Sequence, residues 1–409
     1  MRVWILVGWL SLAGQPTLSL EQAVEEALLH HPSLERLAEL RMAAAARVGQ
    51  AESAALPQLT LEAVVREGPT SGLALGFAGL SNSTLVDNLG ADLVVSQTLL
   101  DFGRRSHLAA GRRLEEEAAR WDEASQRSRL WLEVHRAFLQ ALLARRLVEL
   151  SEQQVELGQT LLRLASARYR AGLVSRLDEE LARAGVGESQ ARLAEARRQE
   201  KEARAQLGAL LGHPVEGDLA EPESNSESRP TTRPDAEALS LRLQAQEEAV
   251  QAAAAEGRPV LRLLATAGTL RVAPEQRAVN HHYAVGLALV WPVYTGGRVE
   301  AEEDEQRHRL NALRAQRKEL EQSTLLEIER ARLWVESLEA ARAGVELQQQ
   351  AAEDGCRLAR KRYEVGLGTL VEVQQAQLAL LVARTRVQQL HYEGFLARAA
   401  LQHAMGVTP

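Results

Sequence analysis

The chain has 409 residues, a net charge of −7 at pH 7 and a single cysteine. The acidic balance, without a basic stripe, argues against nucleic acid as a partner. One cysteine provides neither a disulfide framework nor a thiolate metal cluster. At the start of the chain, Arg2 precedes an apolar run over 3–10 and then small residues, which is the pattern of a secretory signal peptide. We predict a signal peptide over 1–17 and an exported protein without a transmembrane helix.

The sequence that follows is internally duplicated. A shift of 194 residues aligns positions 96–212 with 290–406 without a gap, and a shift of 202 aligns the part before them. Composition alone does not place a Pro, a Gly-Arg pair and a Tyr-x-x-Gly-Leu sequence at matching offsets. We predict repeat 1 over 18–212, a polar linker with no helical face over 213–234, and repeat 2 over 235–409.

Each repeat contains a short helical start and then two stretches in which apolar and polar residues alternate, as in a strand with one apolar face. The predicted strands cover 57–66, 89–99, 259–268 and 282–291, with a Gly/Ser/Asn/Thr-rich loop over 68–88. Their lengths suit strands that cross a bilayer, which need about 9–11 residues. The side chains predicted to face lipid are Leu59, Leu61, Leu93, Val95, Leu261, Leu263, Leu287 and Leu289.

Long helical runs follow the second strand of each repeat. The predicted helices cover 103–170, 175–211, 297–364 and 369–405. A helix over 103–170 would be roughly 100 Å long at about 1.5 Å per residue, which fits no ordinary globular core. The second helix of each pair carries small and apolar residues on a 3.5-residue seam, which allows coiled-coil-like packing.

Four strands alone do not make a stable membrane structure. An open sheet in lipid leaves the backbone groups of its edges without partners, and four strands are too few to close around a wide lumen. We therefore predict an α+β membrane protein that oligomerises. A trimer would give a 12-stranded β-barrel, which the long helices would continue as a helical tube. The alternative is a soluble coiled-coil rod with a small β-hairpin, but the aromatic residues at the strand ends, such as Tyr283 and Trp291, favour a membrane interface.

Several motifs occur in a fixed order along the chain. They are LSLEQAV at 18–24, HPSL at 31–34, LDFGR at 100–104, WPVYTGGR at 291–298, and two Tyr-x-x-Gly-Leu-x-x-[Ser/Thr] turns that begin at Tyr169 and Tyr363. With this order and spacing, essentially all of the mature chain resembles the TolC-type outer-membrane efflux proteins of Gram-negative bacteria. The resemblance implies a trimeric 12-stranded barrel, a periplasmic α-helical tunnel, and docking to a periplasmic adaptor that links an inner-membrane pump.

The resemblance also implies a gate at the periplasmic tip, narrowed by acidic rings. By motif position the gate residues are Tyr169, Asp178, Tyr363 and Glu372. Gly368 and Gln375 stand where the family has an arginine link and a second acid, so the closing network differs here. An acid in a first helical turn is also favoured by the helix dipole, which leaves a purely structural role open for both carboxylates.

The same two turns are predicted to dock the adaptor. Gly172 and Gly366 permit a positive φ or a close backbone approach. The leucines that follow, Leu173 and Leu367, are predicted to be exposed and to anchor the tip of a partner helix. The structural alternative is a helix break that needs Gly and a hydrophobic staple that needs Leu.

No catalytic motif, cofactor motif or metal site is predicted. Of the histidine pairs, His281 and His282 would point to opposite faces of one strand, which makes a poor chelate. The predicted function is a passive exit duct in the outer membrane, with a long periplasmic extension, that carries small toxic compounds or exported polypeptides in a tripartite efflux or secretion system. The alternative is a structural coiled-coil scaffold of the envelope without a pore.

Overall fold

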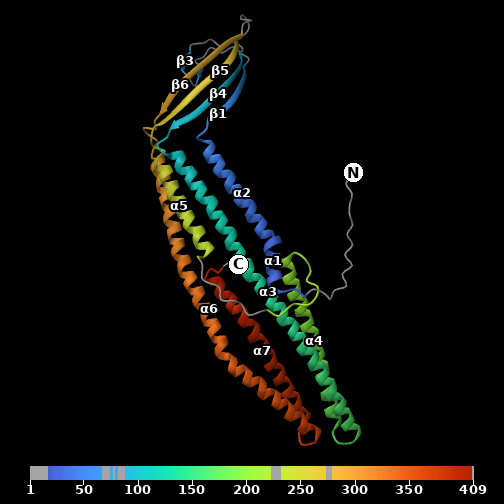
Figure 1. Cartoon of the computed structure of the whole chain (residues 1–409). Helices are drawn as coiled ribbons and strands as arrows, with labels where there is room; N and C mark the ends of the chain where they lie inside the picture. The colour runs from blue at the N-terminus through green and yellow to red at the C-terminus, as the bar shows by residue number, and fades with distance from the viewer. Residues whose placement is uncertain are drawn as a thin grey trace, which may run out of the picture. The chain divides into compact units, whose positions relative to one another are not determined.

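A computed structural model describes residues 17–66, 74–76, 79–81, 88–222, 232–272 and 279–407 (Figure 1). This part of the chain is mostly helical with a few strands. No helix in these ranges combines the length and the apolar character that crossing a membrane requires. Apart from Thr17, the predicted signal peptide lies outside the described residues.

The chain divides into two compact units, and each contains segments of both repeats. The first unit comprises the described residues of Met1–Leu37, Glu123–Pro234 and Leu320–Pro409, and the second those of Ala38–Asp122 and Asp235–Glu319. The duplication therefore does not produce one unit per repeat. Equivalent segments of the two repeats instead come together within each unit.

The first unit contains two helical hairpins. Its elements are α1 (Leu20–His30), the start of α2 (Pro32–Ser53), the later parts of α3 (Arg104–Arg170) and α6 (Arg298–Glu364), α4 (Arg176–Leu211) and α7 (Leu370–Ala404). One hairpin is α3–α4 and the other is α6–α7, and their turns lie at the same end of the unit (Figure 1). Two contacts fix the start of α1. Ser19 and Gln22 form a capping box, and Leu18 forms a parallel β-bridge with Leu219.

The two hairpin turns have the same backbone conformation. Gly172 has a φ of 73° and Gly366 a φ of 81°, which is the left-handed conformation that ends many helices. The next amide of each turn reaches back to a helix carbonyl: Leu173 N–H donates to Arg168 O at 2.9 Å, and Leu367 N–H donates to Arg362 O at 2.8 Å. The repeated Gly-Leu sequence therefore ends both long helices in the same way.

The main hydrophobic core of the first unit surrounds α3. Leu130, Val134 and Phe138 on one face of that helix are fully buried. They pack with apolar side chains of α1 and α4 and with the ring of Tyr392 on α7. The seam predicted along α4 and α7 is also inside, with Ala182, Ala196, Leu207, Val373, Ala383 and Ala397 among its buried members.

The beginning of the linker belongs to this core, which its polar composition did not indicate. Leu219 is 5% exposed and packs in the cluster around α3. Nearby, Glu221 accepts hydrogen bonds from Arg146 at 2.6 Å and from the Tyr392 hydroxyl at 3.0 Å. Burial and the Glu221 carboxylate raise the pKa of Tyr392 to about 12, so that its phenol stays a donor. Residues 223–231 of the predicted linker lie outside the described part of the chain.

The second unit contains a four-stranded antiparallel sheet. Its strands are β1 (Gln58–Arg66), β4 (Asn88–Leu100), β5 (Val260–Val272) and β6 (Val279–Val290), in the order β1-β4-β5-β6. A separate small sheet pairs β2 (Ala74–Gly76) with β3 (Gly79–Ser81), within the stretch predicted as a loop. Strands of three residues are too short to show a two-residue period. The unit also contains α5 (Pro234–Ala254), the rest of α2, and the first parts of α3 and α6.

Equivalent corners connect β4 to α3 and β6 to α6. Each has two successive residues with positive φ: Phe102 at 54° and Gly103 at 93°, then Gly296 at 66° and Gly297 at 83°. A left-handed conformation costs a non-glycine residue roughly 1–2 kcal/mol, so the Phe102 corner is the strained copy. It is held by Asp101, which accepts hydrogen bonds from the backbone N–H groups of Gly103 and Arg105. Burial opposes ionisation of Asp101, but the bonds from Arg105 outweigh it and lower the pKa of the carboxyl.

Candidate functional site

The hairpin turns in the first unit form a small cluster of their own, centred on Tyr363. This residue is 1% exposed, whereas the equivalent Tyr169 is 40% exposed. The buried side chains of the cluster are Leu161, Ala165, Ala182, Tyr363, Leu370 and Val373. The ring of Tyr363 is thus buried between α7 of its own hairpin and α3 and α4 of the other hairpin.

One predicted gate pair comes together in this cluster. The Tyr363 hydroxyl donates to Asp178 Oδ2 over a long distance of 3.4 Å. Burial, and then the charge of Asp178, raise the pKa of Tyr363, so the phenol remains protonated and available as a donor. The contact joins the end of α6 to the first turn of α4, which links the two repeats at the tip.

Arg168 is a tip residue that the sequence reasoning missed. Its Nη1 donates to the carbonyl oxygen of Tyr363, and its guanidinium carbon lies 4.9 Å from the centre of the Tyr363 ring. A Cβ at Gly366 would lie 3.2 Å from Arg168 Nη2, so the arginine also covers the second turn. The sequence does contain a signal for this role, because an arginine directly precedes the tyrosine in both repeats, as Arg168 and Arg362.

The other two predicted gate residues do not join this cluster. Glu372 lies beside Arg362, with 3.9 Å between its Oε2 and Nη1 of the arginine. Arg362 also donates to the carbonyl of Leu367 in its own turn at 3.1 Å. Tyr169 stays at the surface. The predicted docking leucines are prominent, since Leu173 is 67% and Leu367 is 73% exposed.

In the second unit, the sheet separates its side chains cleanly into two faces. Residues directly opposite in antiparallel pairs share a face. The register places Leu59, Val95, Ala265 and Val285 in one row, Leu61, Leu93, Ala267 and Tyr283 in the next, and Leu263 beside Leu287 and Leu261 beside Leu289 in the rows that follow. All eight side chains predicted to face lipid therefore lie on one face. Leu61 and Leu287 are 72% and 65% exposed.

The opposite face of the sheet is mixed, with polar and small residues beside apolar ones such as Val94 and Leu264, and it carries a contact that spans three strands. Asp92 on β4 and His282 on β6 both lie opposite Gly268 on the strand between them. Because Gly268 has no side chain, the Asp92 carboxylate passes over it, and Oδ1 lies 2.9 Å from His282 Nε2. The neighbouring His281 lies on the apolar face, so the two adjacent histidines do point in opposite directions.

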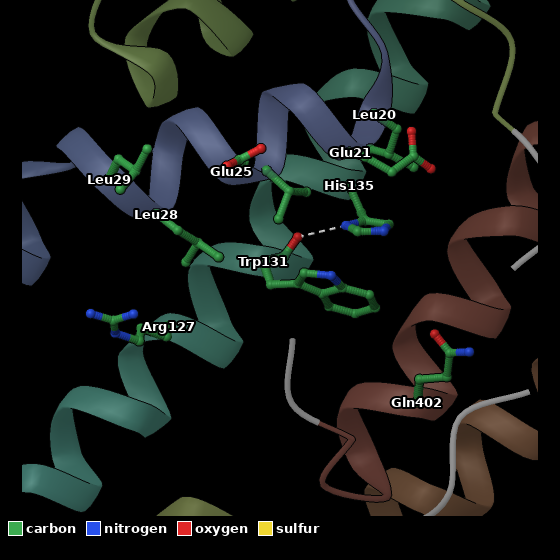
Figure 2. A pocket seen from close by; sticks show the side chains of 10 residues that line it. Leu20, Glu21, Glu25, Leu28, Leu29, Arg127, Trp131, His135 and Gln402 are labelled. Carbon is green, nitrogen blue, oxygen red and sulfur yellow. Dashed lines mark hydrogen bonds between the residues drawn. The ribbon is translucent and has the colours of Figure 1, made fainter. Parts of the chain in front are cut away.

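A hollow of about 610 Å³ lies in the first unit between α1, α3 and the end of α7 (Figure 2). Leu28, Leu29 and Trp131 give it an apolar wall, and Glu21 and Glu25 contribute charge. His135 packs against the Trp131 ring, with 3.9 Å between ring centres, and hydrogen-bonds through Nδ1 to the Trp131 carbonyl at 2.8 Å. Burial lowers the pKa of His135, which favours the neutral ring that packs against Trp131.

Comparison with known proteins decides the family. The model of the family described as "Outer membrane efflux protein" matches residues 23–213 and 231–407. The chain belongs to this family. The resemblance drawn from the sequence motifs is thereby confirmed, and the protein is an outer-membrane efflux channel rather than an enzyme.

Relatives of this efflux protein agree in sequence and in fold. A Pseudomonas aeruginosa protein described as "Pyoverdine export outer membrane protein OpmQ" is 27% identical over 422 residues, which cover 97% of this chain and 86% of the relative. The structure of the Vibrio cholerae outer membrane protein VceC has a TM-score of 0.82 at 24% identity, covering 95% of this chain and 96% of that one. The Neisseria gonorrhoeae MtrE channel, solved in an open state, has a TM-score of 0.80 at 20% identity, with 95% and 89% covered.

The Arg168 contact predicts a specific loss of stability. Replacing Arg168 by Met should remove one hydrogen bond to a buried carbonyl and one cation–π contact, at a combined cost of about 1–2 kcal/mol. The thermal unfolding midpoint of the purified protein measures this loss. Arg170→Met is the matched control, because Arg170 is exposed and donates to the Ser166 carbonyl of its own helix at 3.3 Å. Equal midpoints for the two variants would contradict the assigned role.

Proposed function

We propose that the efflux protein is a homotrimer in which three four-stranded sheets close a 12-stranded barrel, so that the assembly forms a passive exit duct. The observation that carries this proposal is the sheet of the second unit. One of its faces is apolar and exposed, and neither β1 nor β6 pairs with a further strand of the described chain. Backbone groups on such edges need partners in lipid, and strands from two neighbouring copies supply them in a closed ring.

The cargo is proposed from the relatives and from the tip. The Pseudomonas aeruginosa relative is described as exporting pyoverdine, which favours small organic compounds over polypeptides as cargo. Asp178 and Glu372, present three times each in a trimer, would place six carboxylates around the narrow end of the duct. Such rings attract cations. The gate role of these two residues, and of Tyr169 and Tyr363, is part of the proposal.

The proposal predicts discrete, cation-preferring conductance of the purified trimer in a planar bilayer. The double variant Asp178→Asn with Glu372→Gln should weaken the cation preference, measured by reversal potential in a salt gradient, and also the block by multivalent cations. Trimer assembly should not change. A trimer that gives no conductance would favour the scaffold alternative. A double variant that keeps its full cation preference would place the selectivity elsewhere in the lumen.

A matched pair of lysine substitutions tests the lipid-facing set. Lysine at Leu287, on the apolar face, should cost about 2–4 kcal/mol if the residue lies near mid-bilayer. Lysine at the adjacent Gly286 should cost less, because this position is on the other face and has open space around it. The readout is the fraction of protein that assembles as heat-resistant trimer in the outer membrane. Equal losses at the two positions would mean that the assigned strand phase is wrong.

The exposed turn leucines are proposed as the anchor for a periplasmic adaptor, which in turn connects to an inner-membrane pump. The double variant Leu173→Asp with Leu367→Asp should abolish adaptor binding and efflux while trimers still form. Leu177→Asp is the control, since Leu177 is 64% exposed near the same turn but lies within α4. Normal binding and efflux in the double variant would leave the leucines with a purely structural role in the turns.

A further inference from the structure

We propose that the α6–α7 hairpin has a binding site for a tyrosine ring, equivalent to the site in the α3–α4 hairpin that holds Tyr363, and that it receives Tyr169 from a neighbouring copy of this chain. Each of these two sites is called a slot. This inference rests on the proposed trimer and adds to it a defined contact between copies at the tip. The slot consists of five residues near the second turn: Gly355, Ala359, Arg362, Glu372 and Ala376.

The first slot, which Tyr363 of the same chain fills, shows which residues bind a tyrosine side chain at this place. Two alanines of the α3–α4 hairpin, Ala165 and Ala182, make room for the Tyr363 ring. Arg168 covers the ring and donates to the tyrosine carbonyl. Asp178 accepts from the hydroxyl. A slot therefore combines small residues with one arginine and one carboxylate.

The duplication repeats these requirements 194 residues later. Ala165 corresponds to Ala359 and Ala182 to Ala376, so small residues remain small. The arginine Arg168 corresponds to Arg362, and the carboxylate of Asp178 corresponds to that of Glu372. The second hairpin thus has every chemical element of the slot that binds Tyr363. Leu161 corresponds to Gly355, which leaves more space.

The second slot is open in the single chain. The Arg362 and Glu372 side chains are 60% and 44% exposed, and Gly355 is exposed as well. Ala359 lies half-buried at the edge of the Tyr363 cluster, so the two slots share an edge on α6. The arginine and the carboxylate of this slot lie close together, with 3.9 Å between Arg362 Nη1 and Glu372 Oε2.

Tyr169 has the properties of the missing occupant. It is the repeat-1 equivalent of Tyr363, yet it stays 40% exposed although the two hairpins of the chain are in contact through the first slot. The space beside Gly172 is also open, whereas the equivalent Gly366 is covered by Arg168. Among the described residues of one chain, Tyr169 therefore stays exposed, and no tyrosine ring occupies the slot of the α6–α7 hairpin.

If each copy fills the second slot of the next copy, the contacts between copies can form a closed ring. Tyr169 of each copy would meet Arg362 and Glu372 of its neighbour, head to tail. A heterologous contact of this kind forms a ring when its rotation closes. In a trimer the tip would then contain six tyrosine contacts, which alternate between contacts within a chain and contacts between chains.

The two kinds of contact differ in strength. Within the chain, Tyr363 packs beside Leu370 and Val373, which are buried. The equivalents beside Tyr169 are Arg176 and Glu179, neither of which is apolar. Together with Gly355 in place of Leu161, this means that less apolar surface is buried between copies than within one. A tip that opens should therefore part between copies first.

A photo-crosslinker tests the contact directly. p-Benzoyl-L-phenylalanine is introduced at Tyr169 in the full-length protein, the protein is purified as a trimer, and it is irradiated. We expect covalent dimers and trimers on a denaturing gel, with adducts in the 355–376 segment of the neighbouring copy. The same crosslinker at Tyr363 is the matched control, and it should give adducts to the 161–182 segment within one chain, at the mobility of a monomer.

Further variants and readouts separate the possible failures. Arg362→Met should reduce the crosslink from position 169 without changing the crosslink from position 363. Only monomer-sized products from position 169, or adducts outside 355–376, in a protein that is trimeric before irradiation would overturn the inference and leave the proposed duct standing. A protein that is monomeric before irradiation would overturn both.

Discussion

The N–H and C=O groups along the outer edges of β1 and β6 must find partners if the sheet is to lie in lipid. The four strands of one chain form an open sheet, so they cannot supply partners for the backbone groups at its two edges. This demand is the reason why the proposed barrel needs several copies of the chain.

The tip illustrates how a duplicated sequence acquires different roles. Tyr169 and Tyr363 occupy the same position in their repeats and follow the same type of residue, but one is exposed and the other is buried. The difference comes from their surroundings and not from their own hairpins, because both turns have the same left-handed glycine and the same backbone hydrogen bond. Two turns with the same backbone conformation therefore hold one buried tyrosine and one exposed tyrosine.

The local patterns in the sequence predicted much of the fold. A two-residue period is a property of each strand alone, and it was enough to place the eight apolar side chains together on one face of the sheet. Contacts between distant segments were not accessible in this way. Leu219 lies in a largely polar stretch, and its burial depends on α3, α1 and α4. The Arg168 contact with Tyr363, like the Asp92 contact with His282 over Gly268, depends on side-chain directions that no periodicity encodes.

The exposed apolar face of the sheet also has a consequence for biogenesis. Helical hairpins depend on local contacts and form quickly, whereas pairing between strands from distant parts of the chain is slow. Leu59, Leu61, Val285, Leu287 and Leu289 are each more than half exposed in the single chain. During export this surface must cross a watery compartment before lipid covers it, and surfaces of this kind aggregate. The interval between export and insertion is therefore the stage at which this chain is most prone to aggregate.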